Sequence, residues 1–97
     1  MCLGICKIKL RLPENQSLKG KRRVLKSVIA RVRNKFYVAV AEVDSQNLWQ
    51  LATLGIACIS NNTQQANRVL SKVVNFISQS NFEIEMLDYE TETISFS

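Results

Sequence analysis

Residues 6–32, CKIKLRLPENQSLKGKRRVLKSVIARV, decide the fold because their hydrophobic period changes from two to about 3.6 partway along. At the start, Cys6, Ile8 and Leu10 alternate with cations, which is typical of a strand with one face on the core. Pro13 ends this strand, since proline cannot donate a ladder hydrogen bond. The stretch therefore predicts a strand followed directly by a helix.

The helix is expected to start after Ser17, a residue type that favours the N-cap. Gly20 weakens its first turn by about 1 kcal/mol relative to alanine, so the regular helix is expected to begin a few residues late. Lys21 falls inside the apolar arc and is expected either to snorkel or to precede the regular helix. The apolar stripe recurs at spacings of three, four and seven and consists of Leu18, Leu25, Val28, Ile29 and Val32.

The rest of the chain predicts two strands, a second helix and a last strand. The order β-α-β-β-α-β predicts an α+β, ferredoxin-like sandwich: a four-stranded antiparallel sheet of order 4-1-3-2 with both helices on one face. A length of 97 residues predicts one domain, 1–97. In the last strand, Phe82, Ile84 and Met86 are expected on one face, with a change of phase near Leu87–Asp88. The expected ranges are 36–43 and 48–60 for the two strands, a helix capped by Asn62 or Thr63, and 82–96 for the last strand.

Composition limits the chemistry. No apolar run is long enough to span a bilayer and the N-terminus makes a poor signal peptide, so a cytoplasmic protein without a membrane partner is expected. The three cysteines are then reduced, mostly buried, structural thiols. The chain has no histidine, the commonest metal ligand and general base near neutral pH. We therefore expect no catalytic residues, no metal and no cofactor, that is, a protein that is not an enzyme.

The acylphosphatase type is an enzyme class on the same fold. It requires a phosphate-cradling loop with an arginine after the first strand. Residues 12–17, LPENQS, contain neither glycine nor arginine, which argues against this class.

Charge is distributed unevenly along the chain. Residues 1–35 hold eleven cations against Glu14 alone, whereas residues 81–97 hold five acids and no cation. Because the first and last strands lie side by side in the expected sheet, their opposite charges should pair across the open face. That face also lacks the aromatic residues with which an RNA-recognition motif stacks bases. The expected cross-strand partners are Lys7, Lys9 and Arg11 with Glu83, Glu85 and Glu90.

The first helix has no such acidic partner in the sequence. A helical projection gathers five of its cations on one side, here called the basic flank: Lys19, Arg22, Arg23, Lys26 and Arg33. Cations at these spacings repel one another, and a polyanion would relieve that repulsion. The flank predicts RNA or ribosome binding through phosphate contacts. Alternatives are a merely solvated helix, contact with an acidic protein or a membrane surface, or a homodimeric protein-interaction module that uses the open sheet face.

Two further residues carry open alternatives. Trp49, the only tryptophan, is a candidate interface residue that could stack a base, anchor a subunit interface or pin its loop to the core. Glu42 is the only charge in an apolar strand and is expected to be a strand-end charge or the partner of a helix cation.

Three segments together resemble the YlxP-like family of small bacterial proteins. They are SLKGKRRVLKSVIARVRNKF (17–36), VAVAEVD (38–44) and LWQLATLGIACIS (48–60), and the resemblance covers roughly residues 3–88. It implies the ferredoxin-like fold and a link to ribosome or translation-factor biology, but no catalytic residues. Gly20 and Asn47 depart from the acidic or polar residue and the aspartate that the family pattern has there.

Overall fold

The four strands form one sheet in which β1 (Cys2–Arg11) and β3 (Leu51–Ser60) are central. β2 (Ala39–Asp44) and β4 (Glu85–Ser95) form the two edges, giving the order β2-β3-β1-β4. Each neighbouring pair is antiparallel. This is the predicted order 4-1-3-2, read from the opposite edge.

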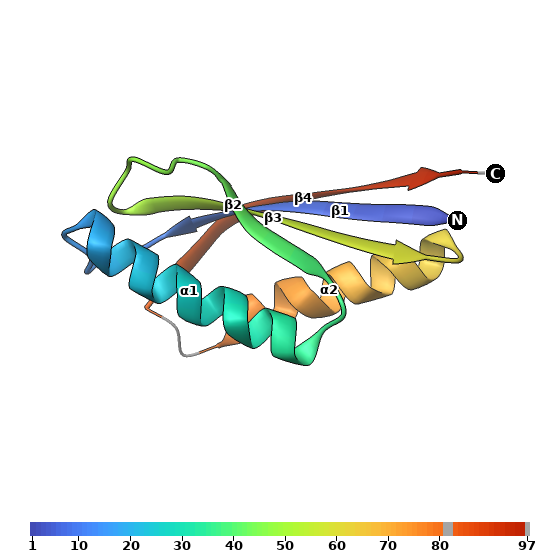
Figure 1. Ribbon diagram of the computed structural model, residues 1–97, viewed down its shortest axis with the longest axis horizontal. Coiled ribbons are helices and arrows are strands. Elements are labelled where there is room, and N and C mark those ends of the chain that lie inside the picture. Colours follow the sequence, from blue (N-terminus) through green and yellow to red (C-terminus); the bar gives the residue numbers. More distant parts are fainter. Residues whose placement is uncertain (81–82, 97) are drawn as a thin grey trace.

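Two helices cover one face of this sheet and leave the other face open (Figure 1). They are α1 (Leu18–Lys35), after β1, and α2 (Thr63–Gln79), after β3. The computed structural model describes residues 1–80 and 83–96. The element order and the layers confirm the predicted α+β, ferredoxin-like fold.

The core lies between the helices and the covered face. On β1, Ile8 and Leu10 are fully buried, while Lys7 and Lys9 point to the open face and are exposed. Full burial of a side chain of this size contributes about 1.5–3 kcal/mol. The period-two pattern in the sequence therefore identifies the core-facing side of the strand. The helices complete the core with Leu25, Val28, Val32, Ala66, Leu70, Val73, Val74 and Ile77.

α1 begins at its N-cap without an irregular turn. Ser17 is extended, and its Oγ accepts a hydrogen bond from the amide of Gly20 at 2.9 Å. The expectation of a late start was therefore wrong, because the cap satisfies an otherwise unpaired amide of the first turn and offsets the poor helix propensity of glycine. α2 is capped in the same way by Asn62, whose Oδ1 accepts from the amide of Gln65 at 2.8 Å.

The second and third strands begin three residues later than predicted. Phe36 belongs to the end of α1, because its amide donates to the carbonyl of Val32 at 2.8 Å. Its ring also packs edge to face on Phe76, with centroids 5.6 Å apart. Phe36, a residue type that favours strands, thus caps the C-terminus of α1 and packs it against α2. β2 therefore begins only at Ala39.

β4 contains the predicted change of phase. Lys9 pairs with Asp88 and Leu10 with Met86, so Leu87 is an extra residue, a bulge in the strand. The bulge lets Met86 face the core while the acids that follow face the open side. The expectation for Phe82 lies outside the described residues.

Candidate nucleic-acid interface

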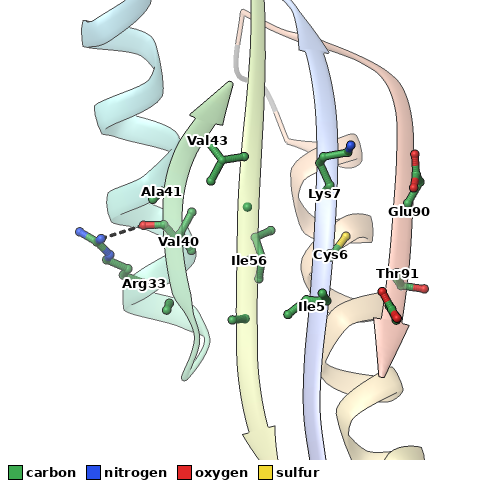
Figure 2. A pocket seen from close by; sticks show the side chains of 14 residues that line it. Ile5, Cys6, Lys7, Arg33, Val40, Ala41, Val43, Ile56, Glu90 and Thr91 are labelled. Atoms are coloured by element: carbon green, nitrogen blue, oxygen red, sulfur yellow. Dashed lines mark hydrogen bonds between the residues drawn. The ribbon is translucent and has the colours of Figure 1, made fainter. Parts of the chain in front are cut away.

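The structure places the basic flank on an exposed side of α1. Lys19, Arg22, Arg23 and Lys26 are exposed, and within residues 1–80 and 83–96 their side chains form no hydrogen bond or ion pair. Arg33 is also exposed, but its Nη2 donates to the carbonyl of Val40 at 2.8 Å (Figure 2). Four of the five predicted residues are thus unpaired, and the fifth is fixed against β2.

The contact of Arg33 shows which way the flank faces. Val40 is on the edge strand β2, so the flank runs along the outer side of α1, beside that edge. Lys26 and Arg22 precede Arg33 by about two and three helical turns and share its side. The opposite side of α1 turns toward α2, where Lys35 Nζ lies 4.9 Å from the ring centroid of Phe76. The flank therefore borders solvent rather than the second helix.

Lys21 behaves unlike its neighbours in α1. It is fully buried, and its Nζ donates to the carbonyls of Ser45 at 2.7 Å, Gln46 at 3.2 Å and Leu51 at 3.1 Å. The expectation that Lys21 snorkels or precedes the helix was wrong, because the ammonium finds these acceptors inside the protein. Lys21 thereby ties α1 to the β2–β3 loop (residues 45–50).

Glu42 neutralises the buried ammonium. Its Oε2 lies 2.9 Å from Lys21 Nζ and has no regular hydrogen bond among the described residues. Three carbonyls already accept from an ammonium that has three N–H groups, so the carboxylate acts mainly as a nearby negative charge. One of the two expected roles of Glu42, partner of a helix cation, is confirmed.

The β2–β3 loop presents Trp49 to solvent. The residue is 56% exposed, so it does not pin the loop to the core. The backbone beneath it is held by Asn15, whose Nδ2 donates to the carbonyls of Trp49 at 2.5 Å and of Ser17 at 2.7 Å. Gln50 strengthens this connection by donating to the carbonyl of Asn15 at 3.1 Å. The loop is thus joined to the segment that starts α1.

The charged residues of the open sheet face compensate one another. Arg11 forms an ion pair with Glu85 at 3.3 Å, and both side chains are about half exposed. An exposed pair of this kind contributes about 0–1 kcal/mol. Lys7 stands opposite Glu90 in the β1–β4 ladder. The expected cross-strand arrangement holds for these residues, except that Glu83 lies before β4. The cations of β1 therefore differ from Lys19, Arg22, Arg23 and Lys26 of the basic flank, which form no ion pair within the described part of the chain.

A hollow of about 620 Å³ lies on the open face between β2 and β4 (Figure 2). Gly55 forms part of its floor, and a Cβ there would come within 2.8 Å of Val43 Cγ1. Glu90 and Glu92 border it on the side of β4. No aromatic side chain from the described part of the chain lines it, so it lacks a platform for stacking bases.

Two of the three buried thiols, Cys6 and Cys58, are unreactive near neutral pH. Burial raises the pKa of the Cys6 thiol to about 11, and it also raises the pKa of Cys58. Both stay protonated near neutral pH, and the thiolate is the nucleophilic form. In the described ranges, no group of three or more cysteine, aspartate or glutamate side chains is placed to hold a metal ion. No helix among these residues is both long and apolar enough to cross a membrane.

Two features near the β2–β3 loop could not be found from the sequence. The acceptors of Lys21 are backbone carbonyls, and Asn15 links two loops through its amide. The only available signal was the position of Lys21 inside the apolar arc of α1, which required a buried partner for its charge.

These elements define a small ferredoxin-like domain with a basic helix flank. Residues 3–91 match the model of the family described as "Protein of unknown function (DUF503)", and the chain belongs to this family. It is also similar to the "Uncharacterized protein YlxP" of Bacillus subtilis (strain 168), with 44% identity over 61 residues. That match covers 63% of this chain and 66% of the relative, just under two thirds.

A solved structure supports the fold alone. The "De novo designed protein Foldit4" superimposes with a TM-score of 0.51 at 15% identity, covering 98% of this chain and 99% of the designed one. A designed protein has no natural partner to suggest, so the similarity supports the architecture and nothing about function.

Proposed function

We propose that this protein is a non-enzymatic, RNA- or ribosome-associated domain that contacts phosphate groups through the basic flank of α1. The observation that carries the proposal is the absence of compensating charge around Lys19, Arg22, Arg23 and Lys26 among the described residues. Five of the eight acids of the chain lie in residues 83–92, and those described in β4 face β1 on the open side of the sheet.

A row of phosphates would remove the repulsion within the flank. Lys19 and Arg23 are four residues apart, as are Arg22 and Lys26, so like charges are neighbours on the helix surface. Phosphate contacts of this kind hold a nucleic acid in place but read little sequence. With four to five contacts, the logarithm of affinity for single-stranded RNA should fall with the logarithm of salt concentration at a slope of about −3 to −4.

Binding to ribosomal subunits and to an unstructured RNA, measured across a salt series, tests the proposal. The variant Arg22→Glu/Lys26→Glu should bind at least tenfold more weakly and with a shallower salt slope. The matched control is Arg68→Glu/Lys72→Glu, an arginine and a lysine at the same spacing on α2, with the same change in net charge. Equal losses in both variants, or no binding by the wild type, would contradict a specific role for the flank.

A second candidate function is homodimerisation through the open sheet face. It is favoured by exposed apolar side chains there: Ile59 is 74% exposed and Val43 is 51% exposed beside the hollow. Light scattering over a range of protein concentrations tests it. A monomer at high concentration would exclude this candidate.

A further inference from the structure

The β2–β3 loop carries an exposed apolar surface at the end of the molecule where α1 starts. Trp49 is 56% exposed and Leu48 is 49% exposed. Both line a hollow of about 540 Å³, which also borders Asn15 and Gln16 from the segment before α1. An indole left open beside a hollow is available to a flat ligand group.

Hydrogen bonds to its backbone anchor this loop to neighbouring segments. Lys21 Nζ donates to the carbonyls of Ser45 and Gln46 on one side of the loop. Asn15 Nδ2 donates to the carbonyl of Trp49 itself on the other side, at 2.5 Å. Because the backbone is anchored on both sides of the indole, little conformational entropy remains to be lost when a ligand binds.

The same contacts bring the backbone of Trp49 close to the start of the basic flank. The Asn15 amide that holds Trp49 also donates to the carbonyl of Ser17, the N-cap of α1, at 2.7 Å. Lys19, the first residue of the flank, follows two positions later. The exposed ring and the row of cations are therefore connected through one side chain.

From this arrangement we propose that Trp49 stacks on an unpaired base of single-stranded RNA whose phosphates follow the basic flank. The inference rests on the proposed function and names the form of RNA that it takes. An aromatic ring combined with a line of cations is how proteins bind single strands, because the ring takes a base while the cations take the backbone. A duplex keeps its bases stacked inside and would leave the indole unused. A protein partner that covers the indole would need acidic groups to match the flank as well, and the titration below distinguishes it from RNA.

Trp49 is the only tryptophan, so its fluorescence reports on this site alone. The experiment titrates the protein with a twelve-nucleotide uridine RNA and with an abasic oligonucleotide of the same length. Both should bind, but only the RNA should quench the fluorescence by stacking. Trp49→Ala should weaken RNA binding by about 5- to 150-fold without changing the salt slope, since no charge is removed. Trp49→Phe should keep most of the affinity.

Other results would overturn the inference in distinguishable ways. If RNA binds without quenching and Trp49→Ala binds as well as the wild type, the stacking role is wrong while the phosphate contacts stand. If the wild type binds neither oligonucleotide, the proposed function fails and the stacking role fails with it. A fluorescence shift that depends on protein concentration in the absence of RNA would instead assign the indole to an interface between copies of the chain.

Discussion

Lys21 and Arg22 are neighbours in α1, yet one is fully buried and the other is exposed. The Lys21 ammonium contacts three carbonyls and a carboxylate, whereas the Arg22 side chain has no partner among the described residues. One face of the helix uses positive charge to hold the protein together, and the other leaves it available to a ligand.

The comparison shows that a count of cations says little about their roles. A buried ammonium needs nearby acceptors to offset its desolvation, so its neighbours reveal a structural role. An exposed cation has no such requirement, and many are simply hydrated. Substitutions on the two sides of α1 should therefore affect different properties, and the largest effects on stability are expected on the inner side.

Lys21→Met should have the largest effect on the stability of the fold. It leaves Glu42 and three backbone carbonyls without their cation, and breaking a buried pair costs about 3–5 kcal/mol; we expect a loss of about 3 kcal/mol in the free energy of unfolding because Glu42 is partly exposed. Urea unfolding followed by circular dichroism measures the loss. The control Arg22→Met should stay within about 0.5 kcal/mol of the wild type. Similar effects of the two substitutions would remove the distinction between the inner and outer sides.

Glu42→Gln should have an intermediate effect, lowering the free energy of unfolding by about 1–2 kcal/mol in the same urea experiment. The amide keeps an oxygen near the ammonium but removes the negative charge, while the carbonyls remain. The matched control is Glu85→Gln, whose partner Arg11 is exposed. This substitution should lower the free energy of unfolding by less than about 1 kcal/mol, and the difference should vanish in 1 M salt. A loss for Glu42→Gln that also vanishes in salt would mean that this pair is accessible to water.

Arg23→Glu should have the smallest effect on stability, and of opposite sign. A glutamate there would have Lys19 four residues before it and Lys26 three residues after it, which replaces repulsion by attraction worth about 0.3–0.5 kcal/mol. Thermal unfolding at low salt should show a slightly higher melting temperature, while RNA binding weakens. The gain should disappear in 0.5 M salt, and a gain that persists there would have to come from something other than charge.

The order of the elements could be predicted from periodicity alone. The alternation around Ile8 and the stripe through Leu25 each identify a core-facing side, and the change of phase at Leu87 locates the bulge in β4. These signals are local, because each depends only on residues that are close together in the sequence. The same locality made Phe36 misleading, since its strand-favouring residue type does not reveal that its amide completes α1.

The candidate site was only partly predictable. The projection of α1 grouped the cations correctly, but it gave no sign that Arg33 donates to the carbonyl of Val40. It also placed Lys21 in the apolar arc without naming an acceptor. Backbone carbonyls are present at every residue, so their role as acceptors leaves no trace in residue types and is fixed only by the tertiary structure. RNA binding by the flank and stacking by Trp49 remain predictions.

The acceptors of Lys21 also bear on the order of events in folding. The carbonyls of Ser45, Gln46 and Leu51 are 24, 25 and 30 residues away along the chain. Burying the ammonium before these carbonyls are in place would leave a charge without partners in an apolar environment. We therefore expect the first turns of α1 to dock only after the β2–β3 hairpin has closed, so that Lys21→Met should affect the folding of the helix and the hairpin together.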